Sequence, residues 1–283
     1  MGSRLKFHYT RARITMQFLV AFILGLTILS MYLEPLEQLW GRLTQYYSSW
    51  VLLIAGPWII HKFLFWPLSL FFLYVDKHNK PDFIARYRIQ QGKPKRPALS
   101  QTLKVLAWNQ LFWAPVMLFL MAAALISLGW EAEAQFPTVL QLCSELLGLG
   151  VIATFIFYTT HRFLHRPWWM KKVHRIHHEY KTTTSIASEY AHPVEFCIGN
   201  FGTLAGGVVL LAPSLFSIYL FTVLSILTIL IHHCGYALPW APWSIPHDWH
   251  HYKYKELFGS VGFLDRILGT DKEFKKLKHD ELY

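Results

Sequence analysis

Residues 161–178 read HRFLHRPWWMKKVHRIHH, and residues 247–251 read HDWHH. Both stretches contain a His-x-x-His-His unit, and the first adds the pair His161 and His165. Residues three and four apart lie on one face of an α-helix, so each stretch can direct two or three imidazoles at one spot. Burying so many polar rings without partners would cost several kcal/mol. A bound metal ion removes that cost because it accepts the nitrogen lone pairs.

Eleven of the fifteen histidines fall in the same part of the chain, between residues 161 and 251. The predicted metal ligands are His161, His165, His174, His177, His178, His192, His232, His233, His247, His250 and His251. His232 and His233 are neighbours at a predicted helix end, so we expect only one of the two to bind directly. The other four are interpreted as ordinary core or interface histidines: His8, His61, His78 and His279.

The composition favours a membrane protein. With 53% hydrophobic, 17% aromatic and only 16% charged residues, the chain is too apolar for an ordinary soluble domain. The predicted transmembrane helices are residues 14–33, 50–75, 105–128 and 138–160. A longer apolar run, residues 198–231, is broken by Pro213 and is interpreted as a hairpin of two helices that is only partly inserted.

The net charge of +10 is distributed as in a membrane protein rather than a nucleic-acid-binding protein. Basic residues precede the first span at Arg4, Lys6, Arg11 and Arg13, and eight more lie between residues 76 and 104. The other two connections are mainly acidic. Because cytoplasmic loops are rich in Lys and Arg, this alternation predicts a cytosolic N-terminus. Four crossings then return the chain to the cytosolic side, where every histidine cluster is expected.

These features predict an all-α, polytopic membrane protein with about four transmembrane helices, a partly inserted hairpin and a histidine-rich dimetal cap on the cytosolic face. Residues 1–137 are assigned to N-terminal membrane helices and a basic cytosolic loop, and residues 138–283 to a histidine-rich catalytic region of one integrated domain. The first span is interpreted as a retained signal anchor, because its apolar run is long and no small-residue cleavage pattern follows. Three scattered cysteines predict no disulfide framework.

The number of candidate ligands indicates two metal ions. A structural zinc site needs four ligands, usually including cysteine, whereas two five- or six-coordinate ions would use the whole set. Imidazole does not by itself distinguish iron, zinc and copper, but a membrane site with few carboxylates favours a diiron centre that activates O2 against a C–H bond. A lipid could enter such a site from the bilayer. Four acidic neighbours are predicted to accept the outer ring N–H of the ligands: Glu179, Glu189, Glu195 and Asp248.

In order and spacing, the motifs resemble the fatty acid hydroxylase superfamily, most of all its sterol desaturase and C4-methylsterol monooxygenase branch. The likeness covers about residues 140–275. The matching strings are HRFLH (161–165), KVHRIHHEY (172–180), EYAHPVE (189–195), HCGY (233–236), HDWHH (247–251) and LDRILGTD (264–271). His232 and Cys234, on either side of His233, depart from that branch, in which other residues are common at these two places.

The resemblance implies a multi-pass oxygenase of the endoplasmic reticulum membrane with two iron ions on the cytosolic side. O2 would be the cosubstrate, and NAD(P)H would supply electrons indirectly, through cytochrome b5 or its reductase. Zinc could replace iron in a purified sample. The expected partners are a sterol or other lipid substrate and the membrane lipids. The motif match carries the ligand role to His161, His165, His174, His177, His178, His247, His250 and His251, together with His192 and His233.

The predicted function is hydroxylation of a sterol or related lipid, or oxidation of one of its methyl groups. Alternatives within the superfamily are lipid desaturation and hydroxylation of a sphingolipid or fatty acyl chain. A non-catalytic alternative is a zinc-bound membrane protein that binds lipid. A metal transporter is disfavoured, because its ligands should lie along a pathway at the membrane midplane.

Overall fold

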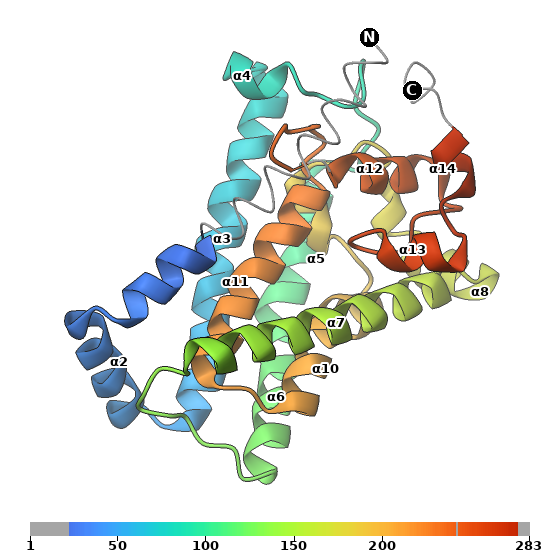
Figure 1. Ribbon diagram of the computed structural model, residues 1–283. Coiled ribbons are helices and arrows are strands. Elements are labelled where there is room, and N and C mark those ends of the chain that lie inside the picture. Colours follow the sequence, from blue (N-terminus) through green and yellow to red (C-terminus); the bar gives the residue numbers. More distant parts are fainter. Residues whose placement is uncertain (1–22, 242, 277–283) are drawn as a thin grey trace.

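The computed structural model describes residues 23–241 and 243–276 (Figure 1). Within these residues the chain is helical, and its only β feature is an isolated bridge between Arg88 and Tyr236. The predicted all-α class is therefore confirmed. Of the predicted first span, residues 14–22 lie outside the described residues, as do Arg4, Lys6, Arg11 and Arg13, while residues 23–31 are helical.

The described elements include α-helices, short 3-10 helices and three π-helical turns. In chain order they are α2 (Glu34–Tyr46), α3 (Ser49–His78), α4 (Asp82–Ala85), α5 (Leu99–Trp108), η1 (Asn109–Trp113), α6 (Ala114–Ser127), α7 (Val139–Leu164), α8 (Pro167–Trp169), η2 (Met170–His174), η3 (His177–Glu179), η4 (Ser185–Glu189), α9 (Pro193–Glu195), η5 (Phe196–Phe201), α10 (Gly202–Leu211), α11 (Leu215–His232), α12 (Ser244–Lys253), α13 (Phe263–Leu268) and α14 (Lys272–Lys276).

Five segments of the described chain are helices long and apolar enough to cross a membrane. They are Ser49–His78, Leu99–Ser127, Val139–Leu164, Pro193–Leu211 and Leu215–His232. The first three correspond to the spans predicted at 50–75, 105–128 and 138–160. The last two correspond to the predicted hairpin, and each of its arms meets the same criterion as the other spans.

Close packing at one glycine holds α3 against α11. A Cβ at Gly56 would overlap the ring of Tyr219, whose hydroxyl donates to the backbone carbonyl of Leu52 at 2.8 Å. Small residues that let helices approach closely are the usual means of association in lipid. Around this contact, buried apolar side chains of five helices (α3, α6, α7, α10 and α11) form one core cluster.

The turn of the hairpin is fixed by a carboxylate from α7. Helix α10 ends at Leu211, its C-cap Ala212 has a left-handed φ of 45°, and Pro213 follows. The N–H and the Oγ of Ser214 both donate to Glu145 Oε2, at 3.2 and 2.8 Å. Glu145 is an acidic residue inside a predicted span, and this contact explains its place there.

The C-terminal helices form a cap at one end of the bundle. Figure 1 shows α12, α13 and α14 gathered beside the C-terminal ends of α7 and α11, and both pairs α11–α12 and α7–α13 are in contact. The basic loop between α3 and α5 joins the same cap, because Ile89 N donates to Gly235 O at 3.0 Å and Ala237 N donates to Tyr87 O at 2.7 Å. The basic loop and the cap therefore lie on one face of the protein.

Candidate metal centre

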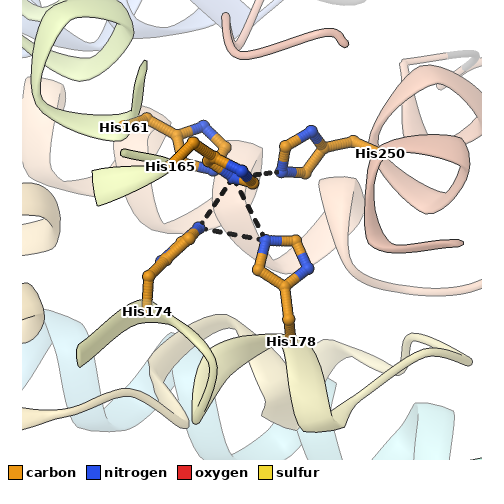
Figure 2. A group of neighbouring side chains, drawn as sticks. All are labelled: His161, His165, His174, His178 and His250. Atoms are coloured by element: carbon orange, nitrogen blue, oxygen red, sulfur yellow. Dashed lines mark hydrogen bonds between the residues drawn. The ribbon is translucent and has the colours of Figure 1, made fainter. Parts of the chain in front are cut away.

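Nine histidines from the ends of α7 and α11, from η2 and η3 and from α12 come together in two groups. Within each group the ring nitrogens lie within 4.8 Å of one another. The first group is His161, His165, His174, His178 and His250, and the second group is His177, His233, His247 and His251. Figure 2 shows the first group, whose rings converge on a common centre from separate segments of the chain.

From the sequence we expected each His-x-x-His-His unit to belong to a single group. Instead, each unit contributes histidines to both groups. In the first unit the i, i+4 pair His174 and His178 belongs to the first group, and His177 belongs to the second. In α12 the i, i+4 pair His247 and His251 belongs to the second group, and His250 belongs to the first. The two units therefore link the groups, which lie side by side.

The nitrogen spacings within each group match the edges of a metal coordination polyhedron. In the first group, His165 Nε2 lies 3.0 Å from His174 Nε2 and 3.1 Å from His250 Nε2. In the second group, His233 Nε2 lies 2.9 Å from His247 Nε2 and 3.3 Å from His177 Nε2. Metal–nitrogen bonds of about 2.1 Å place neighbouring ligand atoms about 3.0 Å apart in an octahedron and about 3.4 Å apart in a tetrahedron.

The outer ring nitrogens identify which tautomer most of these histidines adopt. A backbone carbonyl can only accept a hydrogen bond, so an Nδ1 facing one carries the proton and leaves the Nε2 lone pair free. The Nδ1–carbonyl pairs are His161 with Phe258 (2.8 Å), His177 with Tyr190 (3.2 Å), His233 with Ile229 (2.8 Å), His250 with Glu256 (2.6 Å) and His251 with Tyr180 (3.0 Å).

Some of the short nitrogen contacts therefore cannot be hydrogen bonds. His177 and His233 both hold their protons on Nδ1, so their Nε2 atoms present two lone pairs to each other at 3.3 Å. Two such lone pairs repel unless a cation lies between them. The arrangement fits a bound metal ion and does not fit a self-contained hydrogen-bond network.

Burial keeps the imidazoles in the neutral form that binds metal. Desolvation lowers the pKa of His177 and holds the pKa of His178, His247 and His251 well below the ordinary value, and neighbouring histidines add to the effect in the last three. At neutral pH these rings are uncharged, so they compete little with protons for a metal ion.

Among the four predicted acidic supports, Glu195 contacts a histidine of the first group directly. Glu195 Oε1 accepts from His174 Nδ1 at 2.8 Å. Glu179 accepts from the Tyr190 hydroxyl at 2.7 Å, and Asp248 accepts from the Thr183 hydroxyl at 2.6 Å. Glu189 bonds to His61. Backbone carbonyls accept most of the outer ring N–H groups for which carboxylates were expected. Because every residue has a carbonyl, the sequence does not identify these acceptors.

A buried aspartate holds the loop that supplies two of these carbonyls. Asp265 accepts from the backbone N–H of Phe258 and of Gly259, both at 2.8 Å, and from the Thr270 hydroxyl at 2.7 Å. Burial raises the pKa of Asp265, although these hydrogen bonds oppose the shift. The carbonyls of Glu256 and Phe258 in this loop orient His250 and His161 of the first group, so Asp265 supports that group from outside.

His192 and His232, two of the eleven predicted ligands, lie outside both groups. His192 Nδ1 accepts from Val194 N at 3.1 Å and caps the short helix α9. His232 stacks on His247 with ring centroids 5.5 Å apart, so of the adjacent pair His233 belongs to a group and His232 flanks it. Burial raises the pKa of Cys234 to about 12, so this residue remains a thiol that packs in the core.

A polar network beside the centre includes a histidine interpreted from the sequence as ordinary. His61 Nε2 lies 2.5 Å from Glu189 Oε1, and Gln110 Nε2 donates to Glu189 Oε2 at 2.6 Å. Burial opposes ionisation of Glu189, but His61, Gln110 and Lys62 together hold the pKa of this carboxyl below its ordinary value. The contact joins α3 to η4 across 128 positions, a separation that gives no pattern in the sequence.

A cavity of about 360 Å³ reaches both histidine groups. Its histidine lining includes His161 and His174 from the first group and His177, His233 and His247 from the second. Its walls are mostly apolar, with contributions from α3, α6, α7, η5, α10 and α11. The cavity is of the size usual for small-molecule sites, and its lining on α11 from Phe221 to His232 extends over about 16 Å.

The comparisons with known proteins point to one family. Residues 146–270 match the family model described as fatty acid hydroxylase. "Fatty acid hydroxylase domain-containing protein 2" of Homo sapiens is 35% identical over 248 residues, which cover 84% of this chain and 73% of the relative. "Methylsterol monooxygenase 2-2" of Arabidopsis thaliana is 32% identical, with 86% and 94% covered.

A third relative is named for a different reaction. "Very-long-chain aldehyde decarbonylase GL1-11" of Oryza sativa subsp. japonica is 30% identical over 259 residues, which cover 87% of this chain and 95% of the relative. No solved structure is significantly similar to the chain. The family model spans both histidine groups, and the similarity to whole relatives extends over most of the chain. The chain belongs to the fatty acid hydroxylase family.

Proposed function

We propose that this chain is a membrane-embedded, dioxygen-dependent enzyme that hydroxylates a sterol or related lipid, or oxidises one of its methyl groups. The observation that carries the proposal is that both histidine groups border the same mostly apolar cavity. A lipid carbon in this cavity would lie beside both groups. The relatives named as a methylsterol monooxygenase and an aldehyde decarbonylase support a lipid substrate.

The nine grouped histidines would hold two iron ions, and iron bound there would supply the activation of dioxygen needed to remove hydrogen from an unactivated C–H bond. The residues of the chain perform the other tasks. The five backbone carbonyls and Glu195 hold protons on the outer ring nitrogens and direct the Nε2 lone pairs inward. Apolar side chains such as Trp58, Phe157 and Phe221 line the cavity, where they would exclude water and hold the lipid.

Electrons would come from NAD(P)H through cytochrome b5 or its reductase at the cytosolic surface of the endoplasmic reticulum. The orientation is supported by the basic loop between α3 and α5, which carries Arg88 and Lys95 and packs against the cap. Since basic loops remain in the cytosol, the metal centre would lie on the same side. The hydrogen bonds of this loop with Gly235 and Ala237 connect the basic loop to the part of the chain that carries the metal centre.

The test is iron-dependent turnover in a defined membrane. The full chain, reconstituted in lipid nanodiscs and loaded with ferrous iron, is supplied with NADPH, cytochrome b5 and its reductase, and products from methylsterols, fatty acyl lipids and sphingolipids are identified by mass spectrometry. Oxidised lipid is expected from the wild type and from His78→Ala, an exposed histidine outside both groups. None is expected from His178→Ala or His177→Ala, which each remove a ligand from one group.

The competing function is a zinc-bound, non-catalytic lipid-binding protein. Two tightly held zinc ions, together with no oxidised product in any of these lipid classes after iron loading, would establish that alternative and refute the proposal. Product that forms equally well in His177→Ala and His178→Ala would also refute it.

A further inference from the structure

We propose that His61 and Gln110 are positioning residues for the second histidine group, where they fix the ring of His177. The inference rests on the proposed function and adds to the metal centre two residues that lie outside the matched family region. His61 is in α3 and Gln110 is in η1, whereas the family model matches residues 146–270. Both helical segments that carry them are candidate membrane spans.

Glu189 receives one hydrogen bond on each of its carboxylate oxygens. His61 Nε2 lies 2.5 Å from Oε1, and Gln110 Nε2 donates to Oε2 at 2.6 Å. Lys62 Nζ donates to Gln110 Oε1 at 2.8 Å, which fixes the orientation of this amide. Because Glu189 is only 4% exposed, its position depends on these protein contacts rather than on water.

The backbone on both sides of Tyr190 is held as well. Asn109 Nδ2 donates to the carbonyls of Glu189 and Ala191, at 3.2 and 2.9 Å. Asn109 and Gln110 are consecutive residues of the π-helical turn η1, and both are buried. Such turns are frequent at functional sites. Here the turn presents two neighbouring amides to one short segment of the chain.

The carbonyl of Tyr190 connects these contacts to the second group. It accepts from His177 Nδ1 at 3.2 Å, which keeps the proton on Nδ1 and directs the Nε2 lone pair inward. A displaced carbonyl would no longer hold the ring in this orientation or in this tautomer. We use the term η4 clamp for the side chains that hold the segment: His61, Asn109, Gln110 and Glu189.

The cost of these polar groups indicates a role beyond joining helices. Ionisable side chains inside a membrane span are expensive, and they commonly mark functional sites. A buried ion pair is often no more stabilising than well-packed apolar side chains of similar volume. In contrast to apolar packing, the directional bonds of the η4 clamp fix the position of one carbonyl oxygen, and such supporting contacts give a metal site its precision.

Zinc affinity tests the inference without any turnover. The full chain in nanodiscs is loaded with zinc and dialysed against a series of chelator concentrations. His178→Ala removes a ligand of the first group, so the remaining tightly held zinc reports on the second group. His177→Ala does the reverse. Each of these two backgrounds is combined with substitutions in the η4 clamp.

The expected effect is confined to one background. With His178→Ala, Glu189→Leu should lower the zinc affinity about 10- to 100-fold, the usual cost of losing such a supporting contact. His61→Leu should lower it about tenfold, because the amide bonds to the segment remain. Glu189→Gln should recover most of the affinity, since an amide can still bond to both partners. With His177→Ala, none of these substitutions should change the zinc affinity.

Glu145→Leu is the matched control for a general loss of stability. Glu145 is also a carboxylate that accepts two hydrogen bonds, in this case from the N–H and the hydroxyl of Ser214 at the hairpin turn. Its substitution should lower the unfolding midpoint of the metal-free protein but leave the zinc affinity of both backgrounds unchanged. If Glu189→Leu does not fold, the comparison of His61→Leu with Glu145→Leu decides.

The possible outcomes separate the inference from the proposed function. Unchanged zinc affinity in the clamp variants, equal losses in the two backgrounds, or an equal loss in Glu145→Leu would overturn the inference. A loss confined to the His178→Ala background, in a protein that forms no oxidised lipid after iron loading, would support the inference and count against the function. Oxidised lipid from the wild type, with unchanged zinc affinity in the clamp variants, would support the function and overturn the inference.

Discussion

Asp265→Asn tests how the loop after α12 supports the first histidine group. Asp265 is fully buried, with Oδ1 accepting from Phe258 N and the Thr270 hydroxyl and Oδ2 accepting from Gly259 N. Asparagine can keep the two bonds on one oxygen, but its NH2 group then faces the Gly259 N–H. The variant loses one hydrogen bond to a charged acceptor, which is worth about 1.5–3 kcal/mol of folding stability.

The same substitution should weaken the binding of one metal ion and leave the binding of the other unchanged. The Asp265 loop supplies the carbonyls that accept from His161 and His250, both in the first group, whereas second-group ligands such as His177 are oriented by carbonyls elsewhere. Changes to such supporting contacts typically cost 10- to 100-fold in metal affinity. After dialysis against a series of chelator concentrations, metal analysis should show that the variant loses the ion of the first group at a chelator concentration lower than the wild type requires, by about that factor.

The control for this prediction is Asp82→Asn, which changes an exposed carboxylate whose ion-pair partner among the described residues is the exposed Lys80. It should alter neither the unfolding midpoint nor the metal content, because surface ion pairs contribute little. If Asp265→Asn released both ions together, or left both ions and the unfolding midpoint unchanged, the division into a separately supported first group would be refuted.

Three further predictions concern the ligand support, the pH dependence and the bundle. In the same chelator assay, the affinity for the ion of the first group should fall about tenfold in Glu195→Gln and up to about a hundredfold in Glu195→Ala, because Glu195 orients His174. A metal affinity equal to that of the wild type in both variants would contradict this role. Burial lowers the pKa of His178 and His250 in the folded protein. Below the ordinary histidine pKa of about 6.5, the unfolded chain therefore binds more protons than the folded protein does. As a result, the stability of the metal-free protein should fall as the pH drops from about 7.5 to about 5.5. A thermal midpoint that stays constant over this range would show that the rings are not buried as neutral groups. Gly56→Ala should lower the unfolding free energy in detergent by about 1–3 kcal/mol, because its Cβ overlaps Tyr219, whereas Gly25→Ala, with open space around the Cβ, should have little effect; similar losses in both would argue against this contact.

The sequence predicts much of the candidate metal centre because the grouped histidines are concentrated in short motifs. His174, His177 and His178 lie within five residues, and no soluble core requires such a cluster. The allocation of these histidines to the two groups was not predictable, since the chain passes through the π-helix η2 and the 3-10 helix η3 rather than through one regular helix. In these turns, the rule that residues three and four apart share a face does not decide which ring meets which partner.

The separation of the grouped histidines from neighbouring histidines depends on tertiary contacts. His192 precedes Pro193 at a helix start, and its ring serves as the cap, which a one-dimensional pattern cannot distinguish from ligation. His233 and His232 are adjacent, and only the geometry of the end of α11 shows that His233 joins a group. Backbone carbonyls provide most of the outer contacts, and of the four acidic residues predicted for that role Glu195 bonds directly to a grouped histidine.

The membrane topology follows from composition more directly than the polar contacts inside it. The spans predicted at 50–75, 105–128 and 138–160 correspond to helices of the structure because length and hydropathy decide a span. In contrast, Glu145 and His61 are polar residues inside those spans. Both bond to partners far away in the chain, Glu145 at the hairpin turn and His61 at Glu189, and such pairings become visible only in the folded molecule.

Neutral imidazoles that hold two ions side by side next to the apolar cavity would give two separate metal positions. The most direct test is an anomalous difference map from crystals of the iron-loaded protein, recorded at the iron absorption edge. We expect two peaks, one among His161, His165, His174, His178 and His250 and the other among His177, His233, His247 and His251. A single peak, or iron bound away from these rings, would contradict it.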